Sequence, residues 1–360
     1  MDVVTILVVV CNVLVCLPSM ASRTRMDVWW IRGFDFPRIQ ISVLIAINVV
    51  LALVVYPFDQ AHHFILMGAM LLALGHQLYL IYPYTPLSKK QVVQYAGDSG
   101  GDMISILISN VLTPNDQYEK LLAIIGRKKP DVVLALETDK KWERALAPLE
   151  RDYEHAVKIP QDNLYGMHLY SKLPLRDVSV RYLVVDDIPS IHAKIELPNG
   201  KMATIHCLHP RPPSPTESKT STNRDAELLL VGQEIPEEPK LTLVFGDLND
   251  VAWSRTTKLF QKMSKLMDPR RGRGFFNTYN ANHPLMRWPL DHVFHSDDFT
   301  LVSMSREPHM GSDHFPIYIK LNYTPRMQWQ QEALEASTEE KEWAQEKINK
   351  ADAAGTTIKS

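Results

Sequence analysis

Three long apolar runs occupy the first 85 residues, and no other feature restricts the fold of the chain as strongly. They cover residues 3–20, 39–58 and 63–82. A helix needs about 20 mostly apolar residues to cross a bilayer. The pattern therefore predicts a membrane region at residues 1–85 with three transmembrane helices. A signal peptide is the alternative for the first run, but the chain begins MDVVT and lacks the basic segment that such a peptide carries.

Basic residues orient these helices. The loop between the second and third runs contains no Lys or Arg, whereas the segments that flank the pair contain Arg23, Arg25, Arg32, Arg38, Lys89 and Lys90. Since basic loops stay in the cytoplasm, we expect a multi-pass membrane protein with its following domain on the cytoplasmic side. Buried core helices are the alternative, and the short charged loops between the runs disfavour it.

From about residue 100 the chain alternates short apolar runs with helical patterns. Strands are expected at residues 103–110, 131–137, 202–209, 241–249, 290–296 and 315–321. Helices are expected at residues 115–129 and 214–235. Mixed strands and helices over this length predict an α/β sandwich of two packed sheets with flanking helices.

The predicted domain covers residues 101–324, after a linker at residues 86–100. Residues 325–360 are rich in Glu, Lys, Gln and Ala, and we interpret them as a polar tail, partly a solvated helix and partly disordered.

The net charge of −2 excludes the strong overall basic field of many nucleic-acid-binding proteins. The three cysteines build neither a disulfide framework nor a Cys-rich zinc site.

Polar side chains follow or precede the strongest predicted strands. They are Asn110, Glu137, His209, Asp247, Asn249, Asp291, Asp313 and His314. Each alone has an ordinary explanation as a turn residue or a solvated edge residue. Together they place hard oxygen ligands and imidazoles at most of the strand ends, where sheets hold side chains rigidly.

This set of side chains limits the chemistry. Carboxylates with an amide oxygen suit Mg²⁺, with Mn²⁺ as an alternative, and two histidines can transfer protons or stabilise an anionic transition state. The sequence contains no HExxH, no Walker loop, no GxGxxG and no GxSxG, and DLNDVAWSRTTK departs from a calcium-binding loop. Metal-assisted hydrolysis of a phosphate ester remains.

The same residues, in this order, resemble the endonuclease/exonuclease/phosphatase superfamily, with its DNase I-like nucleases, inositol polyphosphate phosphatases and neutral sphingomyelinases. The resemblance spans residues 103–322 and rests on SN, LALE, YGMHLYSKLPL, IHCLHPRPP, GDLN, PLDHVF and GSDHFPI. The N-terminal WWIRGFDFPRIQ is similar to the membrane-anchored bacterial branch, which implies a bacterial inner membrane. The resemblance implies a four-layer DNase I-like α/β sandwich and a Mg²⁺-dependent phosphoesterase.

The resemblance also implies roles. The metal ligands would be Glu137, Asn110 and Asp313. Asp247, held by Asn249, would align or deprotonate the attacking water. His209 would stabilise the leaving group, and His314, oriented by Asp291, would bind the scissile phosphate. We interpret His206 as structural. Weaker candidates for phosphate contacts are Lys172, Arg211 and Arg273.

The leading functional hypothesis is a hydrolase that acts on phosphodiesters or phosphomonoesters beside a membrane. Nucleic acid, a lipid head group and a small phosphoester all remain open as substrates, and the lipid bilayer is the other expected partner. No obligate protein partner is evident from the sequence. The competing hypothesis is a non-catalytic membrane protein that binds or senses a ligand on the same scaffold.

Overall fold

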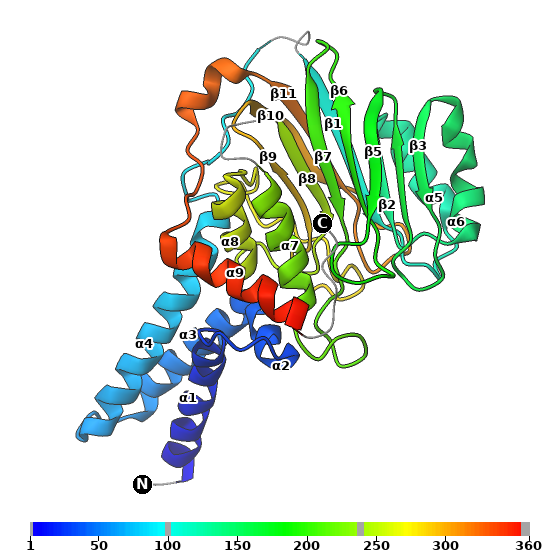
Figure 1. Cartoon of the computed structure of the whole chain (residues 1–360). Coiled ribbons are helices and arrows are strands. Elements are labelled where there is room, and N and C mark those ends of the chain that lie inside the picture. Colours follow the sequence, from blue (N-terminus) through cyan, green and yellow to red (C-terminus); the bar gives the residue numbers. More distant parts are fainter. Residues whose placement is uncertain (1–2, 98–101, 236–240, 354–360) are drawn as a thin grey trace.

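A computed structural model describes residues 3–97, 102–235 and 241–353 of the chain. Three long helices project from an α/β domain (Figure 1): α1 (Val3–Ala21), α3 (Arg38–Val55) and α4 (Ala61–Ile81). Each is long and apolar enough to cross a membrane. Short elements lie at the domain-facing ends of these helices: α2 (Trp29–Arg32), η1 (Gly33–Asp35) and η2 (Tyr82–Tyr84).

The domain contains two mixed sheets. The first has the strand order β10-β11-β1-β2-β4-β3, with β10 (Phe299–Arg306), β11 (Ile317–Tyr323), β1 (Met103–Asn110), β2 (Val132–Leu136), β4 (Met167–Ser171) and β3 (His155–Ile159). The second has the order β5-β6-β7-β8-β9, with β5 (Leu175–Arg181), β6 (Ser190–Glu196), β7 (Met202–Leu208), β8 (Thr242–Asp247) and β9 (Asp291–His295). Each sheet has one parallel pair, β1 with β2 and β7 with β8.

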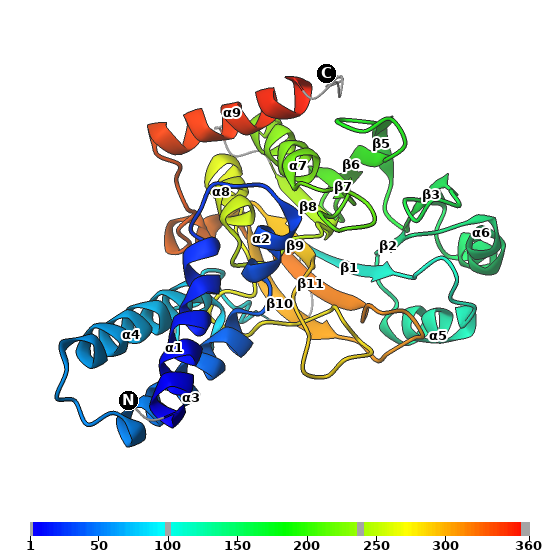
Figure 2. The ribbon, with the colours of Figure 1, turned by 90° about the horizontal axis from the view of Figure 1, so that it is seen from below.

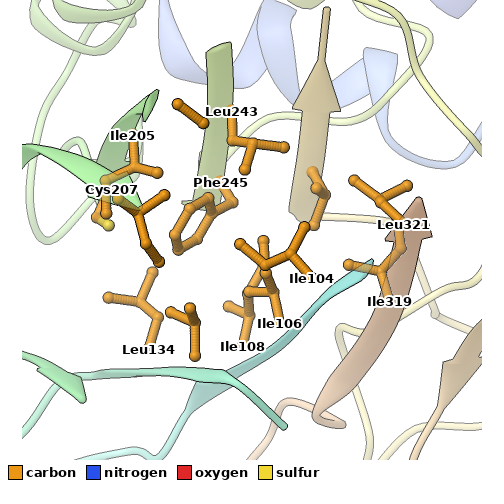
Figure 3. Packing of buried hydrophobic residues seen from close by; sticks show 14 of the residues in the cluster. Ile104, Ile106, Ile108, Leu134, Ile205, Cys207, Leu243, Phe245, Ile319 and Leu321 are labelled. Atoms are coloured by element: carbon orange, nitrogen blue, oxygen red, sulfur yellow. The ribbon is translucent and has the colours of Figure 1, made fainter. Parts of the chain in front are cut away.

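Side chains that alternate along the central strands build the layers. In β1, Ile104, Ile106 and Ile108 face the second sheet, where they meet Leu243 and Phe245 of β8 (Figure 3). The intervening side chains point outward to helices, because successive residues of a strand face opposite sides of the sheet. The space between the two sheets is therefore filled by one continuous apolar core.

Helices cover both outer faces. Outward-facing Leu107 packs with α5 (Tyr118–Lys128) and α6 (Lys140–Leu146) on the first sheet. Outward-facing Val244 packs with α7 (Thr222–Glu234) and α8 (Arg255–Ser264) on the second. The order helix, sheet, sheet, helix confirms the expected four-layer α/β sandwich (Figure 2). A further 3-10 helix, η3 (Ala147–Arg151), follows α6.

Each of the six expected strands is present, and the ends shift by up to two residues. The expected helix at 214–235 is shorter, because its first eight residues form a loop before α7 begins at Thr222. The sequence analysis did not assign secondary structure to α6, α8, β3, β4, β5, β6 or β10.

The C-terminal segment is less solvated than expected. After η4 (Pro325–Gln330), helix α9 (Thr338–Ala353) packs on α7 and α8 through buried Ala344 and Ile348. Lys347 is also buried, with its ammonium 2.7 Å from Asp27 and 2.6 Å from Asp225. The expected helix is therefore present as α9, but one of its faces is buried against the domain instead of solvated. The expected disordered end at residues 354–360 and the linker residues 98–100 lie outside the described residues.

The strand directions bring the polar ends together. The parallel pairs end at Asn110 and Leu136 in one sheet and at Leu208 and Gly246 in the other. The antiparallel neighbours β9 and β11 begin at the same edge, since Asp291 pairs with Asp247 and Ile317 pairs with Ile108. All of the predicted polar strand ends therefore meet at one end of the sandwich.

Gly246 allows β8 to approach β7 at this edge. Its φ of +146° disfavours other residues, and an added Cβ would lie 2.0 Å from the carbonyl oxygen of Leu208. We expect Gly246→Ala to destabilise the fold by about 2 kcal/mol or more. The thermal unfolding midpoint of the full chain should fall by about 4 °C or more.

Gly126→Ala is the matched control for this prediction. Gly126 lies in α5, and an added Cβ there meets no atom within 4 Å. We expect this change to leave the midpoint unchanged or to raise it, because alanine favours a helix by about 1 kcal/mol relative to glycine. Equal midpoints for the two variants would contradict the assigned close approach of β7 and β8.

Candidate active site

Seven of the predicted polar residues line a cavity of about 390 Å³ at this end of the sandwich. The lining includes Asn110, Glu137, His209, Asp247, Asn249, Asp313 and His314. Asp291 lies directly behind His314. The structure thus brings together the eight residues that the sequence analysis assigned to metal binding and catalysis.

Asn110 joins the two sheets at this cavity. Its amide nitrogen donates to Oε1 of Glu137 at 2.7 Å and to Oδ2 of Asp247 at 3.1 Å. Its amide oxygen accepts from the backbone N–H of Leu112 at 3.1 Å, which fixes the orientation of the amide. Asn110 therefore presents its nitrogen to the carboxylates. The expectation that it is an oxygen ligand of the metal does not fit this orientation.

Asp291, His314 and Asp247 form a chain of charged groups. Nδ1 of His314 lies 2.9 Å from Oδ2 of Asp291, and its Nε2 lies 3.4 Å from Oδ2 of Asp247. Burial alone would lower the pKa of His314, but the two carboxylates raise the pKa to about 10. His314 is therefore an imidazolium at neutral pH, held between two buried anions.

His209 has a different environment. It is buried, its Nε2 lies 3.9 Å from Oδ2 of Asp247, and its ring centroid lies 5.3 Å from that of Tyr165. Burial lowers the pKa of His209 to about 4, so its imidazole is neutral at neutral pH. His206, on the preceding strand, places its Nδ1 2.7 Å from Nδ1 of buried His192 and does not line the cavity.

Glu137 has the chemistry of a cation ligand. It follows β2 in the left-handed region, with a φ of +61°. Burial raises the pKa of its carboxyl group to about 7. Its Oε2 is buried and has no hydrogen-bond partner among the described residues. A divalent cation would satisfy this oxygen, and half-buried Asp313 lines the same cavity.

Asp247, Asp291 and His314 also lie close enough to be considered as a metal site, with ligand atoms within 4.8 Å of one another. Both nitrogens of His314 already face carboxylates. A protonated imidazole cannot ligate a metal, because both of its nitrogens carry protons. The cation therefore fits better at Glu137 and Asp313, with Asp247 beside it.

Asp247 and Asn249 meet through a turn. The expected strand at residues 241–249 would keep both residues in an extended chain, but β8 ends at Asp247 and Asn249 has a φ of +51°. Its backbone N–H donates to Oδ1 of Asp247 at 2.9 Å, and its side-chain amide donates to the carbonyl of Pro210 at 3.0 Å. Buried Arg224 of α7, which the sequence analysis missed, donates to the carbonyl of Asn249 at 2.8 Å.

The three weaker candidates for phosphate contacts do not line the cavity. Lys172 follows β4, whose first residue pairs with the end of β2, so Lys172 lies at the opposite end of the sheet from Glu137. Arg211 forms an ion pair with Asp187 at 3.1 Å, and Arg273 donates to the carbonyls of Pro269 and Val92. Lys172 and Arg273 are thus engaged away from the cavity. The guanidinium of Arg211 also lies over the ring of Tyr165 in the cavity wall, 5.6 Å from the ring centroid.

Apolar and aromatic residues complete the cavity wall. They include Phe36, which lies between η1 and α3, Leu164, Tyr165, Tyr279 and Leu290. The sequence analysis missed Phe36 and Tyr279, because no local pattern shows that the N-terminal segment and the loop before β9 reach this edge. Tyr165 is the first residue of the motif YGMHLYSKLPL, so the sequence pointed to this segment but not to Tyr165 as a wall residue.

The fold and the site together define the DNase I-like class of α/β sandwich proteins, a superfamily of metal-dependent phosphoesterases. Residues 105–314 match the model of the Endonuclease/Exonuclease/phosphatase family, and the chain belongs to this family. No curated protein sequence matches the chain.

Solved structures share the fold at low sequence identity. The chain is similar to D. rerio TDP2 complexed with a single-strand DNA product, with 18% identity, a TM-score of 0.50 and coverage of 61% of this chain and 99% of that one. It is also similar to the human nocturnin catalytic domain with bound sulfate, with 16% identity, a TM-score of 0.51 and coverage of 67% and 99%. An endonuclease/exonuclease/phosphatase family protein from Bacteroides thetaiotaomicron shares 14% identity, with a TM-score of 0.51 and coverage of 62% and 99%.

The charge on His314 can be measured directly. Because its folded pKa of about 10 lies above the ordinary value near 6.5, protonation stabilises the fold fully below about pH 6.5. This contribution is lost as the pH rises toward 10. We expect imidazole NMR signals to show His314 doubly protonated at pH 8. Asp291→Asn should lower the pKa of His314 by about one unit or more, because it removes one of the two anions.

His168 provides the internal reference for this titration. It is buried away from the cavity, and burial lowers its pKa to about 4. Its signals should stay those of a neutral ring from pH 6 to 10 in both proteins. A neutral His314 in the wild-type protein at pH 7 would contradict the assigned chain of charges.

Proposed function

We propose that the protein is a membrane-tethered, Mg²⁺-dependent phosphoesterase that hydrolyses phosphodiester or phosphomonoester bonds by in-line attack of water. The observation that carries the proposal is the arrangement around Asp247. Its carboxylate contacts the amide of Asn110 and lies 3.4 Å from the charged ring of His314, next to the unpartnered Oε2 of Glu137. In this proposal a base, a fixed cation and a metal ligand share one small cavity.

Each site residue has a proposed task. Asp247 aligns and deprotonates the attacking water. Burial alone would raise the pKa of Asp247, but the charge of His314 lowers it and keeps the carboxylate ionised. A carboxylate that stays ionised is a weak base, so Asp247 contributes mainly by aligning the water. His314, oriented by Asp291, binds a non-bridging oxygen and stabilises the negative charge that develops there. His209, as a neutral ring, donates a hydrogen bond to the leaving oxygen.

The metal would be held by Glu137 and Asp313. When bound, Mg²⁺ would neutralise charge on the phosphate oxygens, and Mn²⁺ has similar ligand preferences. Asn110 acts as a positioning residue, because its amide fixes both carboxylates from the sheet side. The sulfate in nocturnin and the DNA product in TDP2 support a phosphoester as the substrate of this fold.

A non-catalytic ligand-binding protein is the alternative. Such a protein needs neither an imidazolium between two carboxylates nor a buried unpartnered carboxylate oxygen, since both cost free energy. The site retains both features. Their retention favours an enzyme.

We further propose that the three long helices cross a bacterial inner membrane and that the catalytic domain faces the cytoplasm. The basic residues of the first loop support this topology. The cavity then opens near the bilayer, because Phe36 in its wall lies two residues before α3 begins at Arg38. Gln40 of α3 also donates to the carbonyl of Leu285 in the loop before β9.

Among the three open substrate classes, the cavity fits a lipid phosphoester best. No Lys or Arg is found among the described residues that line it, whereas nucleases need cations along the phosphate backbone. Leu285 and Met286 are 85% and 54% exposed beside α3. These two side chains would enter the membrane interface next to the cavity.

Metal-dependent activity tests the proposed reaction. The full chain in detergent should hydrolyse bis(p-nitrophenyl) phosphate with Mg²⁺ and lose this activity in EDTA. Glu137→Gln should lower kcat by about 10²–10³, because it removes the main ligand and its charge. Lys172→Gln is the matched control and should stay within about twofold, since it lies at the opposite end of the sheet. Activity that survives both EDTA and Glu137→Gln would disprove the proposal.

A second experiment tests the substrate class. At equal phosphate concentration we expect faster hydrolysis of phospholipid in vesicles than of single-stranded or duplex DNA. Replacing Leu285 and Met286 together by serine removes about 3 kcal/mol of apolar insertion into the membrane. Because α1, α3 and α4 still hold the protein on the vesicle, we expect the rate on vesicles to fall by only about tenfold. The same variant should retain its rate on bis(p-nitrophenyl) phosphate. Preference for DNA, with no effect of the variant, would exclude the lipid assignment.

A further inference from the structure

A second cavity, of about 580 Å³, lies between the membrane helices and the catalytic domain. Its wall combines residues at the domain-facing ends of α1, α3 and α4 with residues of α8 and α9, which lie near these ends (Figures 1 and 2). None of its lining residues lines the catalytic cavity. The two cavities are therefore separate sites.

Cations dominate this second cavity. Its lining contains Arg23, Arg25, Arg38, Arg255, Lys258 and Lys262, opposed by Glu339 and Glu340 of α9. Arg38 is committed to Asp35 and to Gln77, yet its buried Nε has no partner in the described part of the chain. Glu339 pairs with Arg25 and Glu340 with Lys262, at 2.8 and 2.6 Å. A surplus of positive charge remains after these pairs are formed.

Much of this surplus comes from one face of α8. Arg255, Lys258 and Lys262 are spaced by three and four residues, so they lie along one side of the helix. No ion pair is found for Lys258 among residues 3–97, 102–235 and 241–353. The pKa of Lys258 is lowered, mainly by burial and next by the positive charge of Lys262. Arg255 makes only a 3.4 Å contact with the carbonyl of Thr24 and lies over the ring of Trp343. Like charges on one face repel, and an anion between them would relieve that repulsion.

With α1, α3 and α4 placed across a membrane as proposed above, this cavity would lie at the depth of lipid head groups. Ser22 and Arg23 come directly after α1, Arg38 is the first residue of α3, and His76 and Leu80 belong to the last turns of α4. Beyond these ends the helices expose large apolar side chains. A ligand at this depth can place a phosphate among the cations and acyl chains along the helices.

We infer that this cavity binds the phosphate head group of an anionic phospholipid from the leaflet on the domain side. The basic side chains of α8 belong to the catalytic domain, whereas Arg23 and Arg38 belong to the membrane region. One head group would thus connect the two parts of the protein and hold the domain at a fixed orientation on the membrane. The site would also be selective, because zwitterionic lipids carry an ammonium that the cations repel.

Lipid binding to the full chain in detergent micelles tests this inference. Native mass spectrometry would measure the apparent affinity for phosphatidylglycerol and for phosphatidylcholine. We expect preference for phosphatidylglycerol, and the double variant Arg255→Gln, Lys258→Gln should weaken its binding by about tenfold or more. Arg23→Gln should weaken it in the same direction. The double variant Lys120→Gln, Lys201→Gln removes the same charge from exposed positions outside the cavity and should bind as the wild type does.

Two further measurements decide the outcome. Hydrolysis of bis(p-nitrophenyl) phosphate should be unchanged in the cavity variants, which shows that they fold and separates this site from the proposed catalytic function. Millimolar inorganic phosphate should not displace the lipid. Equal affinity for both lipids, equal loss in the control variant, or displacement by inorganic phosphate would overturn the lipid site, whether or not the protein is an enzyme.

Discussion

The side-chain amide of Asn110 is the contact on which the active site depends. Two carboxylates from different sheets, Glu137 and Asp247, must lie side by side with little access to water. Their mutual repulsion would push the ends of β2 and β8 apart. The amide donates to both at 2.7 and 3.1 Å, and the charged ring of His314 supplies the remaining compensation. The carboxyl ends of the two parallel strand pairs can therefore converge in one cavity.

The site was largely predictable because it is built at strand ends. An apolar run that stops at a carboxylate, an amide or an imidazole is visible in the sequence, and the eight residues found in this way lie together. Details that depend on local backbone conformation were not predictable. The turn at Asn249 and the orientation of the Asn110 amide follow from hydrogen bonds to Asp247 and Leu112, which no spacing reveals.

Contacts between distant segments were also not visible in the sequence. Lys347 is one of many lysines in a polar segment, yet it is buried between Asp27 and Asp225, which lie 320 and 122 residues away. These ion pairs fix α9 to α7 and to the segment that follows α1. The four-layer sandwich was predictable because the nearly continuous apolar runs of β1 and β8 must be buried on both faces of each sheet. The position of α9 depends on three charges that have no common local pattern.

Other long-range contacts hold the N-terminal helices against the α/β domain. The indole nitrogen of Trp253 donates to the carbonyl of Asp35, and the hydroxyl of Tyr84 donates to the carbonyl of Ala252, at 2.7 and 2.6 Å. The residues of both hydrogen bonds are buried. A change in the angle between the N-terminal helices and the domain would therefore leave buried polar groups without partners. The proposed substrate would enter beside Phe36, and the inferred head-group site is lined by other residues of the same junction. Because the junction is held by these buried contacts, a lipid bound in the second cavity would determine how the proposed catalytic cavity meets the membrane.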